Sequence, residues 1–108
     1  LDPNNPGILS LRAFAYLNRK DYRQVIADAT RSIDLGHRRD DPHANRATAY
    51  AFLGEYDKAV DDYTAAIRRV PVPNYYVQRS AVYAKMGKTE LAEADWQEAK
   101  TMDKTLTE

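Results

Sequence analysis

The chain has 108 residues, and sixteen Lys plus Arg are balanced by sixteen Asp plus Glu, which gives a formal net charge of zero. This balance argues against a protein that coats nucleic acid or an anionic membrane, because both tasks require a basic excess. A hydrophobic share of 44% and the absence of cysteine exclude a disordered chain, disulfides and Cys-ligated metals. No apolar run approaches the roughly 18 residues of a membrane span, so we expect no direct membrane insertion.

The N-terminal third predicts two helices. Asn5 and Pro6 form a start for the first helix. The segment from Asp21 to Gln24 resembles a capping box for the second helix. No segment here or further along alternates convincingly with a period of two residues, so we expect no sheet.

The middle third predicts a second pair. Asp41 can cap a helix that begins with Pro42 and continues to Leu53, and Gly54 ends it. A second amphipathic stretch runs from about Tyr56 to Val70, where the segment 71–73 stops it with two prolines.

The last third predicts a third pair of the same kind. Asn74 is the expected cap of its first helix, Gly87 marks the break, and Thr89 leads into the last helix.

Three segments of the sequence repeat one another. Each begins with Arg, continues with a small residue and ends with Tyr, and the arginines are 34 and 33 residues apart. An aspartate follows each arginine after sixteen residues. The arginines are Arg12, Arg46 and Arg79, and the aspartates are Asp28, Asp62 and Asp95. Self-similarity at this period indicates a stack of helical units.

The pattern resembles the tetratricopeptide repeat (TPR), with the departure that Arg stands where the family usually has Leu, as in a subset of bacterial arrays. The matching residues are Leu9, Ala13, Tyr16, Val25 and Ala29; His43, Ala47, Tyr50, Ala59, Tyr63 and Pro71; and Tyr76, Ser80, Tyr83, Ala92 and Trp96. His37 and Lys104 stand where the family usually has the proline that Pro71 supplies in the middle unit. The resemblance implies an all-α fold, an α-solenoid of three helix-turn-helix units wound into a right-handed superhelix. It also implies a concave groove, lined by the first helix of each unit, that binds peptides or folded partners.

We expect one domain over residues 1–108, with units at about 6–39, 40–72 and 73–106, and residues 1–5 resemble the tail of a preceding repeat. In the last helix Glu93 and Lys100 stand where the second unit has Val60 and Ile67, so we expect the array to end there. The chain could be cut from a longer array. The open face of the first unit could also stack on another copy, which is self-association.

The repeated arginines fall on the packing side of their helices, where a guanidinium needs partners for its five donors. The repeated aspartates are the natural acceptors. We therefore expect bidentate bridges, either within a unit or from the Asp of one unit to the Arg of the next.

No catalytic site is expected, because the chain has no Gly-rich phosphate loop and its serines have no histidine nearby in sequence. The only cluster of metal-ligand residue types is His37, Asp40, Asp41 and His43. A cap at Asp41, a packing role for His43 and repulsion from the adjacent arginine pair explain that cluster better, so we expect no metal and no cofactor.

The working surface should lie on the first helix of each unit, opposite the face that packs on the second helix. Phe14 and Phe52, the only two phenylalanines, are either an anchoring pocket or a contact between neighbouring helices. The expected groove residues are Leu11, Phe14, Leu17, Asn18, Asn45, Thr48, Phe52, Val77, Gln78 and Lys85.

One class within the family grips acidic chaperone tails through a two-carboxylate clamp. Only Asn45 matches that clamp, and the other four places hold Ser10, Phe14, Asn74 and Gln78. Such tails are therefore disfavoured. We expect a non-catalytic scaffold that binds a peptide or protein segment, with no nucleic-acid partner. The alternatives are a regulatory or localising array of a larger enzyme or membrane-associated protein, and a self-assembly module. The compartment stays open, with the cytoplasm slightly favoured.

Overall fold

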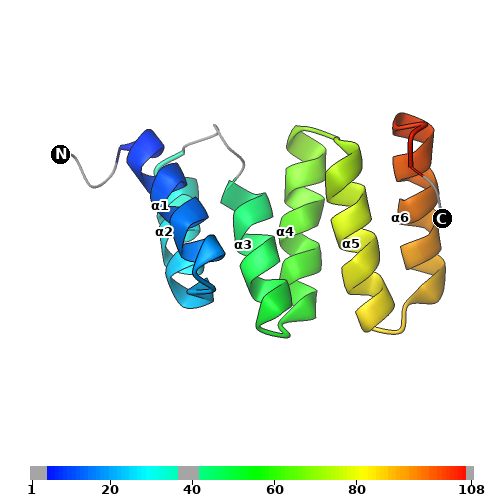
Figure 1. Ribbon diagram of the computed structural model, residues 1–108, viewed down its shortest axis with the longest axis horizontal. Coiled ribbons are helices and arrows are strands. Elements are labelled where there is room, and N and C mark those ends of the chain that lie inside the picture. Colours follow the sequence, from blue (N-terminus) through cyan, green and yellow to red (C-terminus); the bar gives the residue numbers. More distant parts are fainter. Residues whose placement is uncertain (1–4, 37–41, 107–108) are drawn as a thin grey trace.

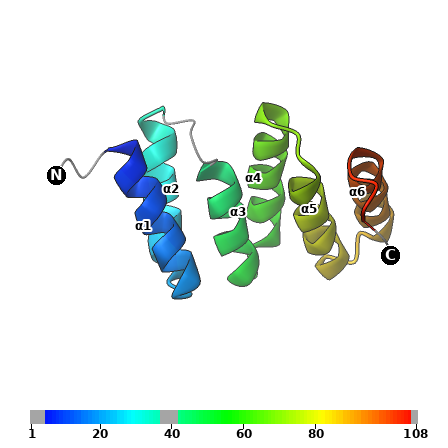
Figure 2. The same ribbon diagram turned by 45° about the horizontal axis from the view of Figure 1, so that its top comes forward.

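The computed structural model describes residues 5–36 and 42–106, and within these ranges it contains helices and no strand. The helices follow one another along the longest axis, with α1 and α6 at opposite ends (Figures 1 and 2), and the extents are 45 × 26 × 22 Å. The predicted all-α solenoid is therefore confirmed. The helices are α1 Pro6–Asn18, α2 Tyr22–Asp34, α3 Pro42–Phe52, α4 Tyr56–Arg69, α5 Pro73–Lys85 and α6 Thr89–Met102.

The starts of the helices only partly follow the predicted caps. Asn5 caps α1, since its side-chain oxygen accepts hydrogen bonds from the backbone N–H groups of Gly7 (2.9 Å) and Ile8 (3.3 Å). The capping box at Asp21 is wrong, because the Asp21 side chain makes no cap bond. Asn74 is not a cap either: Pro73 occupies the first turn of α5, so the helix begins earlier and Asn74 lies inside it. The cap predicted at Asp41 lies outside the described residues.

The same tight turn joins the two helices of every unit. In each, the backbone N–H three residues past the end of the first helix donates to the carbonyl of the repeated tyrosine, at 2.8 Å for Asp21 to Tyr16 and 2.9 Å for Glu55 to Tyr50. This bond closes a Schellman motif, which needs one residue with positive φ. Gly54 (φ 79°) and Gly87 (φ 77°) fill that place in two units, whereas Lys20 (φ 64°) fills it in the first.

Small side chains let the helices pack closely. Ala47 and Ala59 are fully buried where α3 meets α4, and Tyr63 and Val82 complete this core cluster. In the third unit the Ser80 hydroxyl donates to the Ala92 carbonyl at 2.7 Å, which joins α5 to α6. Val70, the predicted end of the second amphipathic stretch, lies just beyond α4 and is exposed.

A ladder of Arg–Asp bridges runs through the stack, and all three bridges lie within a unit. Arg46 donates from Nε and Nη2 to the two carboxylate oxygens of Asp62 (2.7 and 2.8 Å), and Arg12–Asp28 and Arg79–Asp95 have the same bidentate geometry. In each pair the hydrogen bonds to the aspartate raise the pKa of the arginine above its ordinary value. The predicted bridge is confirmed in its within-unit form.

The remaining guanidinium nitrogen links one unit to the unit before it. Arg46 Nη1 donates to the Thr30 hydroxyl at 3.1 Å, and Arg79 Nη1 donates to the Thr64 hydroxyl at 3.0 Å. Arg46 and Arg79 therefore hold their own units together and also bind them to the preceding unit.

Candidate functional site

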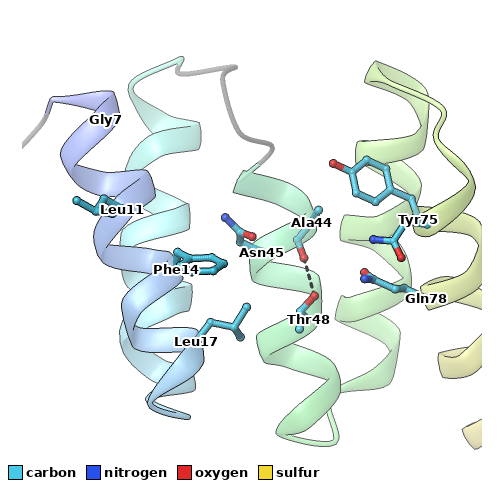
Figure 3. Close-up of a pocket in the computed structure, with 10 residues that line it drawn as sticks. Gly7, Leu11, Phe14, Leu17, Ala44, Asn45, Thr48, Tyr75 and Gln78 are labelled. Carbon is cyan, nitrogen blue, oxygen red and sulfur yellow. Dashed lines mark hydrogen bonds between the residues drawn. The ribbon is translucent and has the colours of Figure 1, made fainter.

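A large hollow lies over the first helices of the three units. It has a volume of about 850 Å³, with α1 and α5 as walls and α3 as floor (Figure 3). This size is in the range of ligand sites in proteins. Its lining residues are Gly7, Leu11, Phe14, Leu17, Ala44, Asn45, Thr48, Asn74, Tyr75 and Gln78.

The α1 wall is apolar and open to solvent. Leu11 is 71% exposed and Phe14 is 60% exposed, and Phe14 and Leu17 point from α1 toward α3 (Figure 3). Large apolar side chains that share one wall and stay exposed are typical of a surface that another molecule covers.

The floor and the α5 wall carry uncharged polar groups. Asn45 lies on the floor, and Tyr75 and Gln78 reach from α5 toward α3 (Figure 3). Within residues 5–36 and 42–106, the amides of Asn45, Asn74 and Gln78 have no hydrogen-bond partner. Each amide offers two donors and an acceptor, so this surface can bind a peptide backbone.

A second, smaller hollow of about 300 Å³ continues the first toward the C-terminal ends of α3 and α5. Thr48 and Gln78 line both hollows, so the two form one groove. We call the two hollows together the inner groove. The second hollow is mostly apolar and has one charged residue, Lys85, in its lining, which consists of Thr48, Ala51, Phe52, Tyr63, Gln78, Ala81, Val82 and Lys85.

Phe52 serves both the groove and the contact between units. Its ring stacks on the ring of Tyr22 at the start of α2, with centroids 5.0 Å apart and planes 4° from parallel. It nevertheless remains 66% exposed and lines the second hollow. The stack holds one face of the ring in place while the residue stays accessible, so the contact with a neighbouring helix is present and the anchoring role stays a prediction.

Thr48 connects the groove to the core. Its hydroxyl donates to the Ala44 carbonyl at 3.0 Å, and the buried Tyr63 phenol donates to the Thr48 oxygen at 2.9 Å. Burial raises the pKa of Tyr63, and the hydrogen bond to Thr48 opposes part of that rise. The floor therefore has no unpaired phenol and is built on the packed interior of the second unit.

Eight of the ten expected groove residues line the inner groove. Asn18 is exposed near the end of α1, and Val77 is half-buried on α5, and neither lines a hollow. A wall helix contributes only the side chains turned toward the floor, which the repeat register alone does not specify. The expectation missed Ala44 and Tyr75 in the first hollow and Ala51, Tyr63 and Val82 in the second, because the width of the groove admits side chains beside the expected stripes.

The described residues contain no group of three or more His, Asp and Glu side chains that could hold a metal ion. His43 lies against Asp62, with 3.3 Å from Nδ1 to the carboxylate, while His37, Asp40 and Asp41 lie outside the described residues. In the part of the chain that the structure covers, every helix is too short or too polar to cross a membrane.

Comparison with known proteins gives a family and two curated relatives. The family model described as tetratricopeptide repeat matches residues 41–71. Serine/threonine-protein phosphatase 5 from Homo sapiens and from Rattus norvegicus are each 31% identical over 71 residues. That match covers 66% of this chain but 14% of the phosphatase chains, so this chain spans a small part of the relatives' length.

The fold also has a solved counterpart. The chain described as "MamA MSR-1 C2" superimposes with a TM-score of 0.86 over 96% of this chain and 60% of that one, at 18% sequence identity. At this identity the likeness concerns the fold.

Proposed function

Because this chain is a tetratricopeptide-repeat protein, and such domains generally bind protein partners, we propose that it is a non-catalytic interaction module that holds a peptide or protein segment in the inner groove. The observation that carries the proposal is the pairing of exposed Leu11 and Phe14 on one wall with unpaired amides on the floor and the facing wall. Burying both kinds of group at once requires a ligand that has apolar side chains and open backbone polar groups.

A second function is favoured by the match to a short part of the phosphatase 5 chains. The same groove would then serve as the regulatory or localising array of a larger enzyme or membrane-associated protein. Self-association through the first-unit face stays a prediction.

The test combines Phe14→Ala, Asn45→Ala and Phe52→Ala in one variant and selects binders from a random heptapeptide display library. We expect the wild-type chain to enrich a defined set of peptides and the triple variant to lose at least tenfold in affinity for them, because two apolar anchors and one amide are removed. Helicity is followed by circular dichroism, since loss of the Phe52 stack also affects packing.

The matched control is Leu35→Ala, Asp61→Ala and Leu91→Ala, which likewise removes two exposed apolar side chains and one polar group, but from the second-helix side. Binding that survives the groove variant and is lost in the control would move the site to the other face of the molecule.

A further inference from the structure

Resting on the proposed function, we propose that the inner groove takes an extended peptide that runs along α3 and carries two apolar side chains two residues apart, with a carboxylate next to the second.

The direction follows from the way the two hollows join. They share Thr48 and Gln78, and together they extend from Asn74 near the start of α5 to Lys85 at its end. Eleven residues of α-helix span about 16 Å, so the groove is elongated along the helix axes. A ligand that fills both hollows lies along α3, and about five residues of extended chain cover this length.

The conformation follows from the amides. The backbone N–H and C=O groups of a helical ligand are already paired inside the helix, so Asn45, Asn74 and Gln78 would gain little from it. An extended segment leaves these groups open along its whole length. The unpaired amides of the groove therefore match an extended peptide rather than a helix.

The spacing follows from the two apolar regions. One is the Phe14 wall, and Phe14 occupies the same repeat position as Thr48 on the floor. The other surrounds Phe52, four residues after Thr48 and therefore about 6 Å further along α3. In an extended chain, residues i and i+2 point to the same side and are about 6.6 Å apart. A ligand that places one apolar side chain in each region therefore carries these two side chains at positions i and i+2.

The charge follows from Lys85. It is the single charged residue in the lining of the inner groove, it stands beside the apolar second hollow, and it forms no ion pair with any residue of the described ranges. A carboxylate next to the second apolar side chain would meet this ammonium group. The carboxylate could belong to an acidic side chain or to the end of the ligand chain.

The test uses a fluorescein-labelled, C-terminally amidated octapeptide of serines with leucines two residues apart and a glutamate directly after the second leucine. Its variants have Glu replaced by Gln, the leucines three residues apart, the whole sequence reversed, or a free C-terminal carboxylate directly after the second leucine. Fluorescence anisotropy measures the dissociation constants for the wild-type chain, Lys85→Gln and Lys88→Gln. Lys88 carries the same charge three residues further on and lines neither hollow.

We expect the glutamate peptide, in one of its two directions, to bind the wild type about two- to fivefold more tightly than its glutamine version. Lys85→Gln should remove this difference, and Lys88→Gln should retain it. The peptide with its leucines at positions i and i+3 should bind the wild type more weakly than the peptide with leucines at i and i+2. The peptide with the free end decides whether a side-chain or a terminal carboxylate is preferred. Equal binding of the glutamate and glutamine peptides, or of both spacings, overturns the inference while leaving groove binding intact. Binding that ignores the Phe14, Asn45 and Phe52 triple variant would overturn the proposed function itself.

Discussion

Lys20 holds the left-handed conformation (φ 64°) that the turn between two helices requires, at the place where the other units have Gly54 and Gly87. A side chain with a Cβ atom is strained there, and glycine is not. The register of the repeat makes the position visible in the sequence once the three turns are aligned, although a lysine carries no turn signal of its own.

Replacing Lys20 with glycine should therefore stabilise the chain. We expect Lys20→Gly to raise the free energy of unfolding by about 0.5–1 kcal/mol, because relief of strain exceeds the added entropy of the unfolded chain. Urea denaturation followed by circular dichroism measures the change. Gly54→Lys is the mirror variant and should lower stability, and a Lys20→Gly variant less stable than the wild type would contradict the argument.

Caps were the least predictable local feature. A polar side chain before a helix signals a cap in the sequence. Proline is favoured in the first turn of a helix, so α5 starts at Pro73, ahead of Asn74. Asn74 therefore lies inside the helix and lines the groove. At Asp21 the backbone carbonyl accepts from the N–H groups of Gln24 and Val25, as at an ordinary helix start, but the side chain makes no cap bond because the residue lacks the extended conformation that Asn5 has.

At the scale of the helices, the Arg–Asp bridge was predictable because both partners recur with one period. The sequence left open whether the bridge lies within a unit or between units. It also left open what the guanidinium nitrogen outside the bridge contacts. Two donors are needed for a bidentate contact, and the third reaches a threonine on the preceding helix pair, a contact set by the packing of α2 on α3 and α4 on α5.

The bridges should differ in their contribution to the free energy of unfolding, because they differ in solvent exposure. The side chain of Arg46 is 20% exposed and that of Arg12 is 45% exposed. We expect Asp62→Ala to cost about 2–4 kcal/mol of unfolding free energy, since it leaves a mostly buried guanidinium without its carboxylate. Asp28→Ala should cost less than half as much, because Arg12 can turn to water. Thermal and urea unfolding of both variants check the order, and a loss below about 0.5 kcal/mol for Asp62→Ala, the size of an ordinary surface change, would disprove the structural role.

At the scale of the whole molecule, the inner groove combines side chains that are far apart in sequence. The repeat register predicted most of them, because equivalent positions of stacked helices face the same way. The sequence could not specify how widely α1 and α5 stand apart over α3, and this separation brings in Tyr75 and leaves out Val77 and Asn18.

The link between units should be separable from the stability of each unit. We expect Thr64→Val to speed amide hydrogen exchange in α5 and α6 by up to about tenfold, since one hydrogen bond between the second and third units is lost. Exchange in α1 and α2 should stay unchanged. Thr101→Val removes an exposed hydroxyl of α6 that bonds only within its own helix, and it serves as the control. Equal acceleration in all six helices would show that the chain opens as one body.

The ladder also bears on how such arrays grow. Each unit contains both partners of its bidentate bridge, so a duplicated repeat carries the aspartate that neutralises its own arginine. The ladder itself asks of the preceding unit one hydroxyl at one helical position. As far as its charges are concerned, a unit of this type is self-contained, and a duplication would leave no unpaired guanidinium in the stack.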